Sequence, residues 1–141
     1  MRQNVKKITG NGLPTLIGSL PAANHQQALD WILDSTPEIP LWPQLPALAK
    51  ERMLNQFIEG LPGIVEEGDR TYFDLNADDF PDKQLSFYEE CLSVSEKPET
   101  LLASRFQTSN DRAAGLYLLA KQAQKTGSHL TAVKGQVAGP F

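Results

Sequence analysis

The chain has 141 residues, which is enough for one domain with a hydrophobic core. Its formal net charge is −4, its pI is near 5.1 and its basic residues are spread along the sequence, which argues against a nucleic-acid-binding function. A single cysteine excludes an internal disulfide, and no stretch approaches the roughly 18 apolar residues that a membrane helix needs.

The same features predict a soluble protein of the cytoplasm. Cys91 is a lone thiol, which is typical of a reducing compartment. Residues 1–7 are polar and no long apolar segment follows them, so we expect no signal peptide. We therefore expect a cytoplasmic protein that binds neither a membrane nor nucleic acid.

The first half of the chain alternates short apolar runs with helical patterns. Residues 15–18 form an apolar, β-branched run that predicts a first strand, and residues 39–42, flanked by prolines, predict a second. Asn24 predicts a helix start, with Gln27 as its capping-box partner. Apolar residues at helical spacing predict a further helix over residues 53–61. The apolar stripe of the first helix is Ala28, Leu29, Ile32 and Leu33.

The second half begins with a hairpin signal at residues 64–75, with Gly68 at the turn. A helix is predicted from Phe80 onward, and a longer one is capped by Thr108 or Asp111. A third strand is predicted over residues 130–134, followed by a Gly- and Pro-rich loop. The expected inner face of the first of these helices is Leu85, Tyr88 and Leu92. That of the second is Ala113, Leu116, Tyr117, Ala120 and Ala123.

Strands that alternate with helices predict an α/β fold with a parallel sheet and right-handed crossovers. A complete (β/α)₈ barrel takes ~250 residues, so three strands amount to less than half of one. We therefore expect a partial (β/α)₈ TIM-type barrel: three parallel strands with their helices, in a single domain over residues 1–141. The hairpin at 64–75 would be an insertion, and the chain would be the opening part of a larger barrel.

Four stretches together resemble the catalytic barrel of cobalamin-independent methionine synthase and its smaller relatives. These proteins share a superfamily with uroporphyrinogen decarboxylase and the corrinoid-dependent methyltransferases. The four stretches are Ile17-Gly18-Ser19-Leu20-Pro21, Trp42-Pro43-Gln44-Leu45-Pro46, Gln56-Phe57-Ile58-Glu59-Gly60-Leu61-Pro62-Gly63 and Lys134-Gly135-Gln136-Val137-Ala138-Gly139-Pro140.

The resemblance implies a site for a thiol acceptor at the ends of the predicted strands. Ile17, Gly18 and Ser19 match a tripeptide that holds homocysteine in the family, where glycine admits a close approach and serine binds a carboxylate. Gln44 stands where the family has a substrate-binding glutamate, and the lost charge argues against an amino-acid substrate. In the loop after the third strand, Lys134 and Gln136 are the further candidates for binding the substrate.

The resemblance also implies zinc in full-length relatives, where the metal activates the acceptor thiol. The family's ligands come from later strands. Cys91, His25 and His129 lie on separate predicted elements without ligand spacing, so we expect no zinc and no other cofactor within this chain.

Three functions follow from these features. The first is that of the amino-terminal segment of a methionine synthase-like enzyme that transfers a methyl group to a thiol. The second is non-catalytic: a truncated or accessory protein that binds a small molecule. The third, decarboxylation of a porphyrin-like polyacid, ranks lower because no arginine-rich segment follows Gly18-Ser19.

The expected fold also predicts a partner. A barrel that stops after three strands has an unpaired edge and an open apolar face. We therefore expect self-association, strand swapping or docking of the remainder of the barrel.

Overall fold

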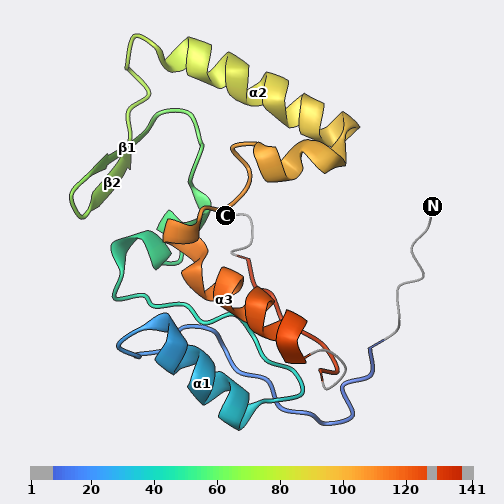
Figure 1. Cartoon of the computed structure of the whole chain (residues 1–141). Coiled ribbons are helices and arrows are strands. Elements are labelled where there is room, and N and C mark those ends of the chain that lie inside the picture. Colours follow the sequence, from blue (N-terminus) through green and yellow to red (C-terminus); the bar gives the residue numbers. More distant parts are fainter. Residues whose placement is uncertain (1–7, 127–129, 138–141) are drawn as a thin grey trace. The chain divides into compact units, whose positions relative to one another are not determined.

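The computed structural model describes residues 8–126 and 130–137, which belong to two compact units (Figure 1). Unit 1 draws on Met1–Pro46 and Ala114–Val137, and unit 2 contains Ala47–Ala113. In the described part of the chain, three α-helices and three short 3₁₀ helices accompany one two-stranded antiparallel sheet. None of the described helices is long and apolar enough to cross a membrane.

Helix α1 (His25–Ser35) in unit 1 begins where the sequence predicts it. The Asn24 side chain accepts a hydrogen bond from the Gln27 N–H at 2.9 Å, and Gln27 Oε1 accepts one from the Ala23 N–H at 2.9 Å. The first bond satisfies a backbone donor of the first helical turn, and the second satisfies the N–H of the residue before the N-cap. Ala28, Leu29 and Ile32 are buried on one face of the helix. The predicted N-cap is confirmed, as is the predicted stripe at Ala28, Leu29 and Ile32, whereas Leu33 is half-buried.

The predicted partial TIM-type barrel with three parallel strands is wrong. Residues 15–18, 39–42 and 130–134 form no strands, and the only sheet in the described ranges is the antiparallel pair of unit 2. Single parallel bridges, Ser19 to Gln44 and Leu41 to Lys134, link the extended segments instead. Pro40 lies within the middle run and Pro43 directly follows it; neither has an N–H to donate, so a continuous ladder cannot extend past them.

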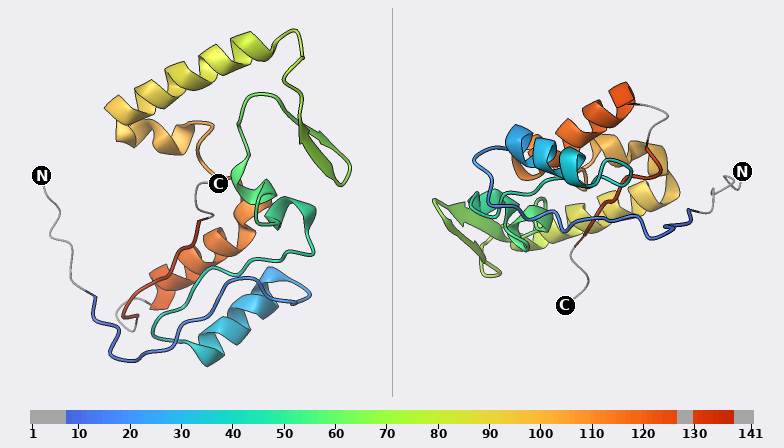
Figure 2. Two further views of the ribbon diagram at one scale, coloured as in Figure 1. Left: turned by 180° about the vertical axis from the view of Figure 1, so that it is seen from behind. Right: turned by 90° about the horizontal axis from the view of Figure 1, so that it is seen from below.

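The extended segments run alongside α1 and the later part of α3 (Asn110–Thr126) in both views of Figure 2. The helix has a non-helical residue at Ala113, and its residues from Ala114 onward belong to unit 1. Gly115 and Leu119 are buried there, whereas Leu116 and Ala120 are exposed. The predicted stripe is therefore wrong in part, because the helix turns its glycine inward.

Unit 2 opens with two 3₁₀ turns, η1 (Ala49–Glu51) and η2 (Asn55–Phe57), where the sequence predicts one helix over residues 53–61. The prediction of that helix is wrong. Asn55 Nδ2 donates to the Ala49 carbonyl at 3.0 Å, and the buried Gln56 side chain donates to the Arg112 carbonyl at 2.6 Å. These side-chain bonds hold the segment in turns, because they satisfy backbone groups without a continuous helix.

The hairpin of unit 2 consists of β1 (Ile64–Glu67) and β2 (Arg70–Phe73), which pair antiparallel with Ile64 opposite Phe73. It lies within residues 64–75, where the sequence indicates a hairpin. Gly68 has φ +59° in the tight turn, a backbone conformation that glycine adopts without strain.

Helix α2 (Phe80–Glu96) starts at the predicted residue, but its predicted inner face is wrong. Leu85, Tyr88 and Leu92 are all exposed. The helix instead presents its opposite side to the chain that follows η3 (Pro98–Ala103), where Phe87 stacks edge-on against Phe106 at 5.3 Å between ring centroids. Glu90 binds both the backbone N–H and the guanidinium of Arg105 on the same side.

Candidate functional site

The candidate site is a group of polar side chains in unit 1, Ser19, Gln44, Lys134 and Gln136, which we call the polar cluster. They come from three extended segments that are far apart in the sequence. The Gln44 N–H donates to the Gly18 carbonyl at 2.8 Å, and the Leu20 N–H donates to the Gln44 carbonyl at 3.0 Å. The Lys134 N–H donates to the Pro40 carbonyl at 2.9 Å, which joins the third segment to the middle one.

Two of the predicted site residues contact each other directly. Gln136 Nε2 donates to Gln44 Oε1, although the two residues are 92 positions apart. Gln44 is buried and Gln136 is half-buried, so this amide pair lies below the surface of unit 1. A glutamate at position 44 would present a second oxygen here; the glutamine presents one acceptor and two donors.

Lys134 is anchored within unit 1. Its Nζ donates to the Leu16 carbonyl at 2.8 Å, and the residue is half-buried. An ammonium group has three N–H donors, so this bond leaves two for other acceptors. Lys134 therefore brings a fixed positive charge to the end of the first segment.

The sequence predicted that Gly18 leaves room for a ligand, but the space beside Gly18 is occupied by the middle segment of the chain. A Cβ at this position would lie 2.6 Å from the Trp42 carbonyl oxygen and 3.1 Å from Gln44 Oε1. The space that the missing side chain leaves is therefore filled by the middle segment of the chain. Gly18 permits close packing of two segments, which in turn sets the position of Gln44.

The other two residues of the predicted tripeptide point to solvent. The Ile17 residue is 74% exposed, and Ser19 is exposed as well. The Ser19 hydroxyl thus remains accessible beside the Gln44 backbone, to which its own residue is bridged. Ile17 takes no part in the polar cluster.

Zinc, which the family resemblance implies, does not fit the residues described. Among residues 8–126 and 130–137, no three His, Cys, Asp or Glu side chains lie close enough together to hold a metal ion. Cys91 is exposed on α2, and His129 lies outside the described residues. We therefore derive no step through zinc for this chain.

Unit 2 contains an ionic cluster around one buried arginine, and no sequence motif predicts it. Arg112 is only 4% exposed; its guanidinium donates to the Asn55 carbonyl at 2.5 Å and also to Glu66. Arg112 Nε lies 3.6 Å from Glu59, whose carboxylate accepts the Ser109 N–H at 2.9 Å. Every partner is remote in the sequence, so no local motif could have revealed the cluster.

Neighbouring groups shift the pKa values of two other titratable side chains of unit 2, Glu90 and Tyr72. Bonds from the Arg105 backbone N–H and guanidinium hold the pKa of the Glu90 carboxyl below its ordinary value. The hydrogen bond from the Tyr72 hydroxyl to Glu67, at 3.1 Å, raises the pKa of that phenol. Glu90 is thus a structural anion, and Tyr72 stays a neutral donor.

Comparison with known proteins identified no relative of this chain. No protein-family model matches the chain, and neither the curated proteins nor the solved structures include a significant match.

Proposed function

We propose that unit 1 binds the acceptor of a thiol methyltransferase, a small thiol that carries a carboxylate. The observation that supports the proposal is that Ser19, Gln44 and Gln136 come together from three separate segments, with the Lys134 ammonium bonded to the Leu16 carbonyl of the first segment. The motifs that carry the resemblance to methionine synthases contain these same four residues.

The chemistry of the polar cluster suits a carboxylate. The Ser19 hydroxyl and the free N–H groups of Lys134 are donors, and the ammonium supplies the countercharge. Because Gln44 is neutral where the family has a glutamate, no carboxylate at that position forms an ion pair with an α-amino group. The acceptor that fits best is therefore a thiol acid without an amino group.

A binding experiment tests the proposal. The purified chain is titrated with 3-mercaptopropionate, propanethiol and homocysteine, and backbone amide shifts are followed by NMR. We expect saturable binding of 3-mercaptopropionate only, with shifts at residues 18–20, 44 and 134–136. Loss of a charged hydrogen bond weakens binding by about tenfold or more, which is the effect expected for Lys134→Gln.

Ser19→Ala is the second variant, because the exposed hydroxyl can be removed without disturbing the Lys134 bond to Leu16. Ser35→Ala, at the exposed end of α1 in the same unit, is its matched control. Binding that is unaffected by both Ser19→Ala and Lys134→Gln, or propanethiol binding as tightly as the acid, would contradict the proposal.

The alternative is a non-catalytic protein that binds the same class of ligand. It is favoured by the composition of the polar cluster, since hydroxyl, amide and ammonium groups recognise a carboxylate without breaking bonds. Methyl transfer from methylcobalamin or a methyl-folate to 3-mercaptopropionate separates the two functions. Binding without transfer would favour the non-catalytic protein.

We further propose that the protein works in the cytoplasm, on the basis of its lone cysteine. Self-association stays a prediction. It was predicted from the unpaired edge and the open apolar face of a partial barrel, and the residues described form no such barrel. Sedimentation of the purified chain over a range of concentrations measures it directly.

A further inference from the structure

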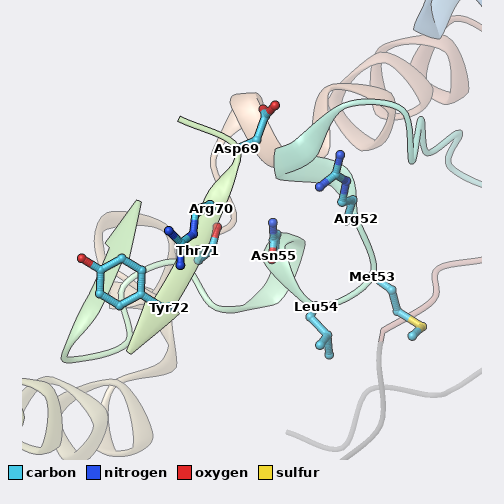
Figure 3. A pocket seen from close by; sticks show the side chains of 8 residues that line it. All are labelled: Arg52, Met53, Leu54, Asn55, Asp69, Arg70, Thr71 and Tyr72. Atoms are coloured by element: carbon cyan, nitrogen blue, oxygen red, sulfur yellow. The ribbon is translucent and has the colours of Figure 1, made fainter. Parts of the chain in front are cut away.

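A second candidate binding site, independent of the polar cluster, lies wholly within unit 2. It is an open pocket of about 520 Å³ between the η1–η2 loop and the hairpin (Figure 3). In the close-up, Asn55 lies between Arg52 of the loop and Arg70 of the hairpin. The residues that line the pocket are Arg52, Met53, Leu54, Asn55, Asp69, Arg70, Thr71 and Tyr72.

The local structure explains why these residues line the pocket. The two 3₁₀ turns leave Arg52, Met53 and Leu54 in an exposed stretch between them. The tight turn at Gly68 starts β2 at Arg70; Arg70 and Tyr72 project from one face of this strand and Thr71 from the other, and all three line the pocket.

The two arginines of the pocket differ from the other arginines that the structure describes. Arg105 is paired with Glu90, and Arg112 with Glu59 and Glu66. Arg52 and Arg70 make no ion pair with any described residue, although the chain has 17 acidic residues against 13 basic ones. Unpaired guanidinium groups that line one pocket are available to an anion from outside.

The remaining residues of the lining indicate the charge and the polarity of the ligand that would fit the pocket. Asp69 is the one carboxylate of the lining, so the pocket keeps a formal charge of +1 from two arginines and one aspartate. Tyr72 donates its hydroxyl to Glu67, which leaves its ring as contact surface. Met53 and Leu54 are exposed and add apolar surface on the loop side. Asn55 donates to the Ala49 carbonyl, so its Oδ1 can accept.

We propose that this pocket binds an organic phosphate, with the phosphoryl group between Arg52 and Arg70 and the organic part against Met53, Leu54 and Tyr72. The planar guanidinium matches phosphate oxygens with two parallel N–H bonds. A phosphomonoester carries about −1.5 to −2 charges at pH 7, which suits two arginines better than the single charge of a carboxylate does.

The test uses phenyl phosphate as the probe on the full chain at constant ionic strength, with inorganic phosphate and benzoate as comparison ligands. We expect saturable binding of phenyl phosphate, with amide shifts at residues 52–55 and 69–72. Arg52→Gln and Arg70→Gln should each weaken binding by about tenfold or more, as for the loss of a charge-assisted bond.

Lys97→Gln is the matched control, because it removes one positive charge from an exposed position elsewhere in unit 2. It should change the affinity by less than about twofold, since Lys97 does not line the pocket and salt screens exposed charges. Equal losses in all three variants would mean unspecific attraction and would overturn the proposal. So would binding of inorganic phosphate or benzoate as tight as that of phenyl phosphate. Circular dichroism of each variant checks that the fold is unchanged.

Discussion

Gly115 sets how closely α3 lies against the middle extended segment of unit 1. A Cβ added to Gly115 would lie 1.8 Å from the Pro43 carbonyl oxygen and 2.8 Å from its carbonyl carbon. Both of these atoms belong to the backbone, so no side-chain rotation can relieve the clash. The same segment carries Gln44, which means that one glycine helps to position the polar cluster.

We predict that Gly115→Ala destabilises unit 1. In an exposed helix this change usually stabilises by about 1 kcal/mol, because alanine has the higher helix propensity. Here the helix must move away from the segment, and overpacking of a close-packed interior costs about 1–3 kcal/mol or more. Urea unfolding followed by tryptophan fluorescence measures the change. Gly10→Ala, whose Cβ would meet nothing within 4 Å, is the control. A stabilised Gly115→Ala variant would contradict the packing described here.

Glu90 gives unit 2 a dependence on pH whose sign can be worked out. Its pKa is lowered in the folded chain, chiefly by the hydrogen bond from the Arg105 backbone N–H. Between the lowered folded pKa and the unfolded value of about 4.3, the unfolded chain binds more protons. The stabilisation from Glu90 is therefore fully present above the unfolded pKa and is lost as the pH falls through the folded pKa.

We predict that Glu90→Gln reduces the loss of stability in acid. The urea midpoint, followed by circular dichroism from pH 7 downward, should fall less steeply in this variant than in the wild type. Glu89→Gln removes an adjacent, exposed carboxyl that makes no ion pair with a described residue, and it should keep the wild-type slope. Identical slopes in Glu90→Gln and the wild type would rule out this role for Glu90.

At the scale of elements, the sequence predicted those features whose causes are local. The cap of α1 depends on bonds between Ala23, Asn24 and Gln27, and the start of α2 depends on Phe80-Pro81; short patterns specify both. The helix over residues 53–61 was wrong because Gln56 bonds to Arg112, 56 positions away. Propensity alone contains no information about a partner so remote.

The candidate sites show the same limit. The family resemblance singled out Gln44, and the loop after the predicted third strand singled out Gln136. Their direct bond depends on how three segments pair, and the predicted barrel pairing of these segments was wrong. The pocket of Arg52 and Arg70 has no motif at all. It arises because a turn-rich loop and a hairpin lie together in unit 2, and each arginine looks like an ordinary surface residue when only the sequence is known.

We predict that leucines of α1 and α2 differ sharply in their contribution to stability. Leu29 is 1% exposed, and Leu29→Ala should lower the free energy of unfolding by about 2–5 kcal/mol through lost burial and the cavity left behind. Leu85 is 60% exposed, and Leu85→Ala should change it by about 0.5 kcal/mol or less. Urea unfolding followed by circular dichroism compares the two. A large loss in Leu85→Ala would show that the outer face of α2 is covered in solution.

At the scale of the whole molecule, apolar burial is concentrated in unit 1. Among the described residues, the buried apolar side chains of unit 1 are Ala28, Leu29, Ile32, Leu41, Trp42, Leu45 and Leu119, whereas unit 2 has Ala113. Unit 2 buries Glu51, Gln56 and Arg112 instead. Burial of apolar surface is the dominant stabilising term in folding, so unit 2 should be the weaker of the two.

We predict that the two units unfold in separate steps, unit 2 at the lower urea concentration. Both tryptophans, Trp31 and Trp42, belong to unit 1, so tryptophan fluorescence reports that unit alone, while circular dichroism reports both. The two signals should therefore have different midpoints. Arg112→Met removes the buried guanidinium that pairs with the partly exposed Glu59 and Glu66, and it should shift only the first step. Coincident transitions in the wild type would show a single cooperative unit.

The order of the chain also constrains how the protein can be made. Residues 47–113, which form unit 2, separate the two stretches that build unit 1. The bond from Lys134 to Leu16 spans 118 positions, and the bond from Gln136 to Gln44 spans 92. Loop-closure entropy rises with the length of chain between paired residues, and such remote contacts form slowly. During translation, Leu16 and Gln44 are therefore synthesised well before their partners Lys134 and Gln136, because residues 47–113 are translated in between. Residues 130–137 are synthesised after the other two segments of unit 1, so the polar cluster can be assembled only once these residues have been translated.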